Sequence, residues 1–218
     1  MSRTTTIIDS ILFAAGTQRN VAPQDWYSEI VAGGYRAVIF DCDGTLVESS
    51  EAHFQSFRAA IRAQGHDIAE SWYAQRTGLD RRSLLTAFAS SISGTFDVNA
   101  ASQASIEAFN NLTAKVSPIA ETVTLVQQIW QSRPMAVGTN AEAEVAKASL
   151  QATNLLGYFD FIVSVSDGHA AKPAPDIFND ARRRLGFPAA RTLVFEDSAE
   201  GVRAALAAGL DSIQVSQA

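Results

Sequence analysis

The sequence has little cysteine, no excess of positive charge and no long apolar run. Its 218 residues include one cysteine, Cys42, which cannot form a disulfide within the chain, so a reducing cytoplasm fits best. The net charge of −6 argues against a general nucleic-acid binder, which would need a basic face. No stretch approaches the roughly 20 apolar residues that a membrane span requires. We therefore expect a cytoplasmic protein that binds neither nucleic acid nor a membrane, and the sequence leaves its oligomeric state open.

The order of strands and helices predicts an α/β fold. Hydrophobic residues make up 47% of the chain and charged residues 18%, which fits one medium α/β domain or such a domain with a smaller insertion. The expected strands are 37–40, 135–138, 159–165, 192–195 and 212–215, and the helices between them are 119–131, 142–153, 175–185 and 198–208. This alternation predicts a doubly wound, mostly parallel, Rossmann-like sheet with right-handed crossovers.

Two segments lie outside this alternation. Residues 50–116 are almost free of strand signals and predict an inserted α-helical module. Its expected helices are 51–64, 68–76, 81–91 and 100–115. Residues 1–34 form a lead-in before the first expected strand. That lead-in includes a helix over 23–31. Its residues Trp26 and Ile30, with Tyr27 as a further candidate, would face the core or a partner, and packing on the core is the simpler interpretation. The α/β core then comprises residues 35–49 and 117–218.

The segment Phe40-Asp41-Cys42-Asp43-Gly44-Thr45-Leu46 carries the strongest chemical signal. Asp41 and Asp43 come just after a short buried strand, where open α/β sheets build their sites. Two carboxylates this close need a cation or a proton to relieve their repulsion. One of them can act as a nucleophile and the other can move a proton, while a divalent metal holds the first in its charged form. Cys42 should point away from both acids into the core.

Other polar residues follow the later strands at the same end of the sheet. Thr139-Asn140 follow one strand, Glu196-Asp197 end another, and Lys172 lies in a loop after a third. Because parallel strands end at one edge of a sheet, these groups should converge with the two aspartates on one crevice. Each also has a purely local interpretation: Thr139 as a helix cap, Lys172 as a surface lysine, and Glu196-Asp197 as charges favouring a helix N-terminus.

Four motifs in this order make the chain resemble the haloacid dehalogenase superfamily. They are Asp-Cys-Asp-Gly-Thr at 41–45, Gly-Thr-Asn at 138–140, Lys-Pro-Ala-Pro-Asp at 172–176 and Glu-Asp-Ser at 196–198. The match covers residues 36–215, and the module at 50–116 resembles the α-helical cap of the subgroup that includes phosphatases and β-phosphoglucomutase. The resemblance implies a haloacid dehalogenase α/β core whose cap covers the site.

The resemblance also implies a role for each motif residue. Asp41 would attack phosphorus and become an aspartyl-phosphate, and Asp43 would first protonate the leaving oxygen and then help deprotonate the attacking water. Asp41, Asp197 and the backbone carbonyl of Asp43 would hold Mg²⁺, with Glu196 supporting that oxygen shell directly or through water. The phosphoryl oxygens would be bound by Thr139, Asn140 and Lys172.

Two cap residues bear on the choice between reactions. His53 falls where β-phosphoglucomutase carries a histidine, and Gly78-Leu79-Asp80-Arg81 resembles that enzyme's Gly-x-x-Arg loop. Arg81 could hold a phosphate or an acidic group at the far end of a substrate. A bland interpretation also stands for each: His53 as a packing or hinge residue, and Arg81 with Arg82 as solvated helix charges.

The reaction class follows from the second acid and from the residues after the second motif. The dehalogenases and phosphonate hydrolases of the superfamily lack an aspartate two residues after the nucleophile. The presence of Asp43 therefore favours phosphate esters as substrates. The mutase carries Ser and Lys where this chain has Ala141 and Glu142, neither of which can donate as needed. We therefore predict a Mg²⁺-dependent phosphatase that acts on a small phosphorylated metabolite such as a sugar phosphate. A phosphosugar mutase is the alternative, and a non-catalytic phosphate-binding relative is disfavoured because every catalytic position is filled.

Overall fold

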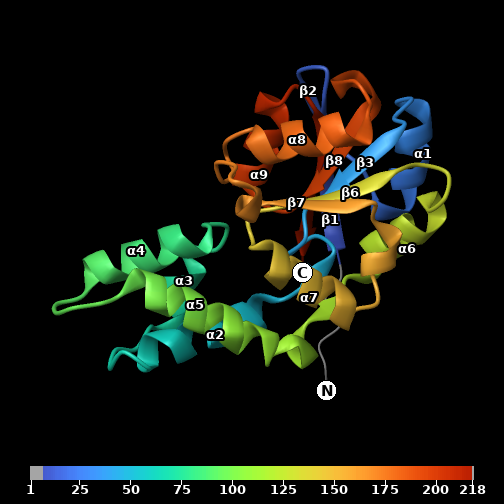
Figure 1. Ribbon diagram of the computed structural model, residues 1–218. Helices are drawn as coiled ribbons and strands as arrows, with labels where there is room; N and C mark the ends of the chain where they lie inside the picture. The colour runs from blue at the N-terminus through green and yellow to red at the C-terminus, as the bar shows by residue number, and fades with distance from the viewer. Residues whose placement is uncertain (1–6, 218) are drawn as a thin grey trace.

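A seven-stranded sheet forms the centre of the molecule. The computed structural model describes residues 7–217, and its sheet has the strand order β2-β1-β9-β8-β3-β6-β7 (Figure 1). The strands are β1 (Ile7–Ala14), β2 (Thr17–Asn20), β3 (Ala37–Phe40), β6 (Met135–Thr139), β7 (Phe161–Ser164), β8 (Thr192–Glu196) and β9 (Asp211–Gln217). From β9 to β7 neighbouring strands are parallel, whereas β1 is antiparallel to both β2 and β9. The mostly parallel Rossmann-like sheet predicted from the sequence is confirmed.

Helices cover both faces of this sheet because its central strands are apolar on both sides. The core helices are α1 (Trp26–Ala32), α6 (Ala120–Ile129), α7 (Ala143–Ala152), α8 (Asp176–Leu185) and α9 (Ala199–Ala207). Phe40 and Phe195 point to the face that packs against α1, α6 and α7. Ile39 and Val194, their neighbours along the strands, point to the opposite face and pack against α8 and α9. Figure 1 shows α8 and α9 above the sheet and α6 and α7 below it.

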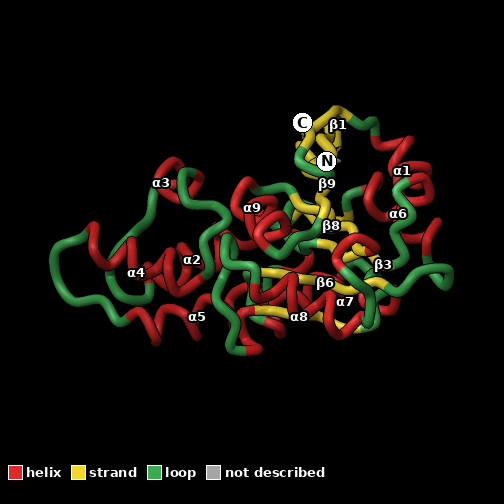
Figure 2. The backbone as a smooth tube through the Cα atoms, turned by 90° about the horizontal axis from the view of Figure 1, so that it is seen from above, coloured by secondary structure: helices red, strands yellow, loops and turns green. Residues whose placement is uncertain are grey.

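Four consecutive helices form a lobe beside the sheet, at the left of Figures 1 and 2. They are α2 (Ser50–Arg62), α3 (Glu70–Ala74), α4 (Arg81–Ser91) and α5 (Val98–Asn110). This cap lobe has its own apolar cluster, in which Phe57, Leu85 and Phe88 are buried. Two chain segments connect the lobe with the core, and they pair as a short antiparallel ribbon of β4 (Val47–Glu48) and β5 (Ser117–Pro118). Among the helices within residues 7–217, none is long and apolar enough to cross a membrane.

The lead-in corrects one expectation. The sequence predicts a first strand at 37–40, but β1 and β2 precede it as a hairpin that extends the sheet past β9. The polar residues within β1 interrupt the apolar pattern that would predict a strand. One of them, Ser10, is nevertheless fully buried and accepts a hydrogen bond from the Trp26 indole at 2.8 Å. Trp26 and Ile30 are buried as expected, whereas Tyr27 does not pack in the core because 44% of it is exposed. Residues 1–6 of the predicted lead-in lie outside the described part of the chain.

Candidate active site

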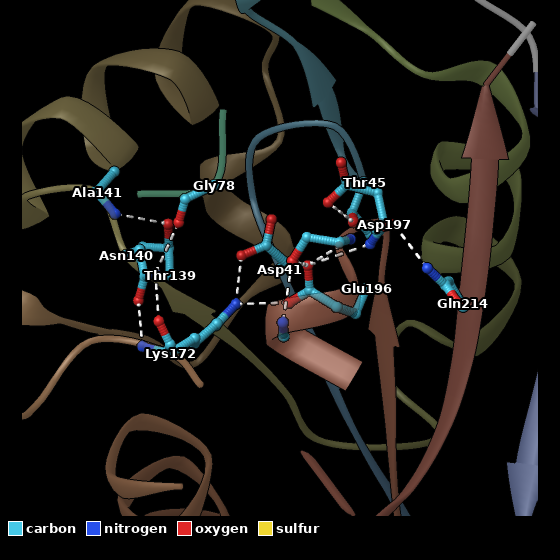
Figure 3. Close-up of polar contacts among 12 residues, drawn as sticks. Asp41, Thr45, Gly78, Thr139, Asn140, Ala141, Lys172, Glu196, Asp197 and Gln214 are labelled. Carbon is cyan, nitrogen blue, oxygen red and sulfur yellow. Dashed lines mark hydrogen bonds and ion pairs between the residues drawn. The ribbon is translucent and has the colours of Figure 1, made fainter. Parts of the chain in front are cut away.

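Three adjacent parallel strands end at the same edge of the sheet and carry the predicted groups to it. β3 lies between β6 and β8, and Phe40 of β3 is level with Phe195 of β8. Asp41 follows β3 directly, and its backbone N–H donates to the carbonyl of Phe195 at 2.8 Å. Thr139 and Glu196 are the last residues of β6 and β8. Figure 3 shows their side chains and those of their neighbours converging on one region.

Lys172 reaches from a loop after β7 into the middle of this group. Its Nζ donates to Oδ1 of Asp41 and, at 2.7 Å, to Oε2 of Glu196 (Figure 3). The Nζ atom also lies 4.5 Å from the centre of the Phe178 ring. Only 6% of Lys172 is exposed, so its interpretation as a surface lysine is wrong. Burial alone would lower the pKa of Lys172, but Asp41 and Glu196 outweigh it and raise that pKa, so the lysine stays charged.

Three acidic groups lie close enough together to share one cation. Carboxylate oxygens of Asp41, Glu196 and Asp197 lie within 4.8 Å of one another. Oε1 of Glu196 accepts from the hydroxyl of Ser198 at 2.8 Å, and Oε2 already accepts from the lysine. The Asp197 carboxylate has a weaker protein contact, with the Thr45 hydroxyl at 3.5 Å. The Asp197 carboxylate is therefore less occupied by protein donors than the carboxylates of Glu196 and Asp41.

The charge balance of this cluster fits a divalent metal. One lysine cannot neutralise three carboxylates, two of which, Asp41 and Glu196, are nearly inaccessible to solvent. Burial and then the charge of Glu196 raise the pKa of Asp41 to about 8, against the opposing effect of Lys172. Burial and the charges of Glu196 and Asp41 also raise the pKa of Asp197 well above its usual value. Hard oxygen donors carrying this excess of negative charge are a suitable shell for Mg²⁺.

Gly44 allows the first motif to lie very close to Asp197, which follows β8. It has a φ of +85°, and a Cβ atom there would lie 2.1 Å from Oδ2 of Asp197. No other residue could adopt this turn without displacing the carboxylate. The glycine in the motif thus helps to position Asp197 beside Asp41.

Asp43 points toward the cap lobe and away from the acidic cluster. Its Oδ1 accepts a hydrogen bond from the Ser49 hydroxyl at 2.5 Å and lies 3.1 Å from Nε2 of His53. Burial acts to raise the pKa of Asp43, but His53 and Ser49 together bring it below the usual value. His53 itself packs on Phe109, with ring centres 4.4 Å apart. Its two predicted roles, packing and contact with the site, are therefore compatible.

Thr139 and Asn140 lie at the end of β6 and bond to neighbouring backbone groups. The Thr139 hydroxyl accepts from the backbone N–H of Ala141 at 3.0 Å. This bond closes a turn and does not cap α7, whose N-cap residue is Glu142, so the helix-cap interpretation of Thr139 is wrong. Thr139 also lines the cavity described below. Oδ1 of Asn140 accepts from the backbone N–H of Lys172 at 2.8 Å, and its amide donates to the Gly78 carbonyl at 3.2 Å. Asn140 therefore connects the lysine loop with the cap lobe (Figure 3).

The convergent groups open into a cavity of about 600 Å³ between the core and the cap lobe. Core residues at its base include Asp41, Thr139 and Lys172, and the cap lobe contributes His53 and Arg81. The volume and mixed lining suit a small polar ligand. The predicted site residues from both parts of the chain thus face the same space.

Arg81 is not the solvated charge that one interpretation allowed. Only 4% of it is exposed, and its Nε donates to Oε2 of Glu142 at 2.9 Å. Its Nη1 donates to the Ser105 hydroxyl at 2.7 Å, and the guanidinium lies 4.8 Å from the centre of the Phe57 ring. Arg82, by contrast, is exposed and bonds only to another surface residue among the described contacts, Asn99.

Sequence reasoning missed two residues at this site. Ser49 donates its hydroxyl to Asp43, and the signal for this contact in the sequence is a hydroxyl residue near the first motif, just before a predicted helix. Glu142 accepts a hydrogen bond from Arg81, a contact that spans 61 positions of the chain. No local pattern could have revealed that second contact.

Comparison with known proteins gives consistent matches. A family model of haloacid dehalogenase-like hydrolases matches residues 35–209. Fructose-1-phosphate phosphatase YqaB of Escherichia coli is 31% identical over 182 residues, which are 83% of this chain and 96% of that protein. A phosphoglycolate phosphatase of Rhodobacter capsulatus is 30% identical over 186 residues, covering 80% of this chain and 81% of the relative. Among solved structures, CbbY of Rhodobacter sphaeroides in complex with phosphate aligns with a TM-score of 0.76 and 28% identity, over 82% of this chain and 84% of that one.

Proposed function

Because the chain belongs to the haloacid dehalogenase-like hydrolase family, we propose that it is a Mg²⁺-dependent phosphatase that cleaves a small organic phosphate monoester through an aspartyl-phosphate. The observation that carries the proposal is the buried contact of Lys172 with Asp41 and Glu196 at the convergent strand ends. A sugar phosphate is the substrate class that best fits the cavity and the names of the relatives.

In the first half-reaction, a carboxylate oxygen of Asp41 attacks phosphorus while the bond from phosphorus to the leaving oxygen breaks. Asp43 donates a proton to that oxygen, so the product leaves as an alcohol. The pKa of Asp43 is lowered in the free site, but a bound phosphate dianion nearby would raise it and favour the protonated acid. In the second half-reaction, Asp43 takes a proton from water as the water oxygen attacks the aspartyl-phosphate and releases phosphate.

Lys172 has two tasks in this scheme. Its charge keeps Asp41 partly ionised and so available as a nucleophile, and its ammonium group can donate to the transferring phosphoryl oxygens as their charge develops. Thr139 and Asn140 would complete the phosphate-binding groups from the end of β6.

The metal would be held by the carboxylates of Asp41 and Asp197 with the backbone carbonyl of Asp43, and Glu196 would support this shell. When bound, the Mg²⁺ ion would offset the negative charge of the carboxylates and the phosphate. We propose that residues 50–116 act as the cap, which excludes bulk water and supplies His53 and Arg81 to the far side of the cavity.

A phosphosugar mutase is the second candidate. It is favoured by the contact of His53 with Asp43 and by structural likeness to a proposed β-phosphoglucomutase of Thermotoga maritima, with a TM-score of 0.60 and 25% identity over 80% of this chain and 82% of that one. Against it, Glu142 occupies the cavity wall where the mutase has a phosphate-binding donor, and a carboxylate would repel a second phosphate.

A phosphate-release screen across sugar, polyol and nucleotide phosphates tests the proposal. The protein should release phosphate from at least one sugar or polyol phosphate, and Asp41→Asn should remove essentially all of this turnover because an amide cannot attack phosphorus. Asp25→Asn is the matched control, since that side chain is exposed and lies in the lead-in. Isomer conversion without phosphate release would favour the mutase, and near wild-type turnover in Asp41→Asn would refute the covalent mechanism.

A further inference from the structure

The far wall of the cavity carries a buried ion pair between the cap lobe and the core. Arg81 begins α4, and Glu142 lies just before α7 of the core. Both line the cavity, and Nε of Arg81 is 2.9 Å from Oε2 of Glu142. The side chains are 3% and 19% exposed. The guanidinium charge is therefore already matched by the protein before any ligand binds.

The other cations on the cavity wall also have protein partners. Lys172 is held by Asp41 and Glu196. Arg76 stacks on the Trp72 ring at 3.9 Å and donates to the Trp72 carbonyl at 2.9 Å. Acids outnumber these cations on the wall: besides the four acidic residues of the first and fourth motifs, they include Glu48, Glu142 and Glu200. A second anionic group on a substrate would meet excess negative charge beyond the catalytic phosphate site.

We propose that Glu142 determines substrate specificity: together with Arg81 it selects monophosphates whose far end bears hydroxyl groups and disfavours a second phosphate or carboxylate. This inference rests on the proposed phosphatase function. It replaces the sequence-based expectation that Arg81 holds an acidic group of the substrate.

The chemistry of a hydroxyl matches the pair. A guanidinium has five N–H groups, of which the Nε and one Nη1 hydrogen are used by Glu142 and Ser105. Glu142 uses Oε2 for Arg81, which leaves Oε1 as a further acceptor. A sugar hydroxyl can accept from the first and donate to the second, whereas a phosphate dianion has no proton to donate and would be repelled by Glu142.

The test compares two substrates that differ by one phosphate. Fructose 1-phosphate and fructose 1,6-bisphosphate share a carbon skeleton, and p-nitrophenyl phosphate lacks a hydroxylated far end. For the wild-type protein, we expect kcat/KM for the monophosphate to exceed that for the bisphosphate by at least about tenfold, the scale of a like-charge penalty of about 1.4 kcal/mol. Glu142→Gln keeps the size and one acceptor but removes the charge, so it should reduce this ratio by about tenfold.

Glu144→Gln is the matched control. Glu144 carries the same charge in the first turn of α7, is exposed, and is absent from the described cavity lining. Its substitution should leave the ratio of the two kcat/KM values unchanged. That result would show that the change in Glu142→Gln is not a general effect of net charge.

Each outcome decides the matter. An unchanged ratio in Glu142→Gln, or equal losses on all three substrates, would overturn the inference and make the pair a simple latch between the lobes, while the phosphatase function would stand. If Glu142→Gln does not fold, the wild-type ratio still decides, because equal use of both fructose phosphates refutes the inference. Where fructose 1-phosphate is not used, the best sugar monophosphate of the screen and its bisphosphate replace the fructose pair. Failure to release phosphate from every substrate of the screen would instead remove the proposed function, and this inference with it.

Discussion

Binding of Mg²⁺ to the acidic cluster should release protons and should strengthen as the pH rises from 6 to 8. Burial and the charge of Glu196 raise the pKa of Asp41 to about 8, and the pKa of Asp197 is raised as well. Without a divalent cation, the cluster therefore retains a proton near neutral pH. A metal that needs both carboxylates ionised has to displace that proton.

The size of this effect follows from the ionised fraction of the cluster. With a pKa of about 8, roughly one molecule in a hundred is ionised at pH 6 and about half at pH 8. The apparent Mg²⁺ affinity should therefore rise about fiftyfold, or about 2 kcal/mol. An acid whose pKa is higher in the folded than in the unfolded chain stabilises the fold most at low pH. This group should therefore cost the metal-free protein about 2 kcal/mol of unfolding free energy between pH 6 and pH 8.

Isothermal titration calorimetry measures both quantities. Titrations at each pH in two buffers of different ionisation enthalpy give the affinity and the number of protons released. Thermal melts should show a larger stabilisation by Mg²⁺ at pH 8 than at pH 6, because the metal removes the repulsion that the higher pH exposes. Asp25→Asn should behave like the wild-type protein. Equal affinity at pH 6 and pH 8 without proton release would refute the electrostatic account of the cluster.

Metal exchange and two substitutions test other parts of the site. EDTA should abolish turnover and Mg²⁺ should restore it, with Ca²⁺ restoring it poorly because of its larger and looser oxygen shell; full activity of a metal-free preparation would contradict this. Arg81→Ala should weaken catalysis on the preferred substrate by about 1–3 kcal/mol and affect p-nitrophenyl phosphate much less, so equal losses would instead indicate a misfolded cap. Gly201→Ala should weaken Mg²⁺ binding, measured by titration, because its Cβ would lie 1.9 Å from Oε2 of Glu196 and would push that carboxylate away from Lys172. Gly157→Ala, whose Cβ would meet nothing within 4 Å, is the matched control, and equal Mg²⁺ affinity in the two variants would contradict the reasoning.

The placement of the proposed catalytic groups could be predicted because it follows from the sheet. Asp41, Thr139 and Glu196 each end or follow an apolar run, and parallel pairing puts the ends of such runs at one edge. Lys172 required more, since only the order of the four motifs distinguished it from a surface lysine. Its burial depends on Asn140, which holds the loop, and on Phe178 beneath the ammonium group.

The lead-in hairpin could not be predicted because its stability comes from distant partners. β1 pairs with β9 near the other end of the chain, and its interior residue Ser10 is polar. That serine fits the core only because Val21 and Trp26 provide its hydrogen-bond partners. A local pattern of apolar and polar residues cannot show such compensation.

The contact between Arg81 and Glu142 could not be predicted from the sequence. Most of the proposed catalytic residues lie at strand ends, where the regular pairing of the sheet fixes their neighbours. Arg81 belongs to α4 of the cap lobe and Glu142 to the entry of α7, so their meeting depends on how two separately packed lobes approach each other. A change on either side alters the charge that faces the substrate while leaving the strand-end groups in place. The reaction can therefore stay constant while substrate preference changes with a single residue at this contact.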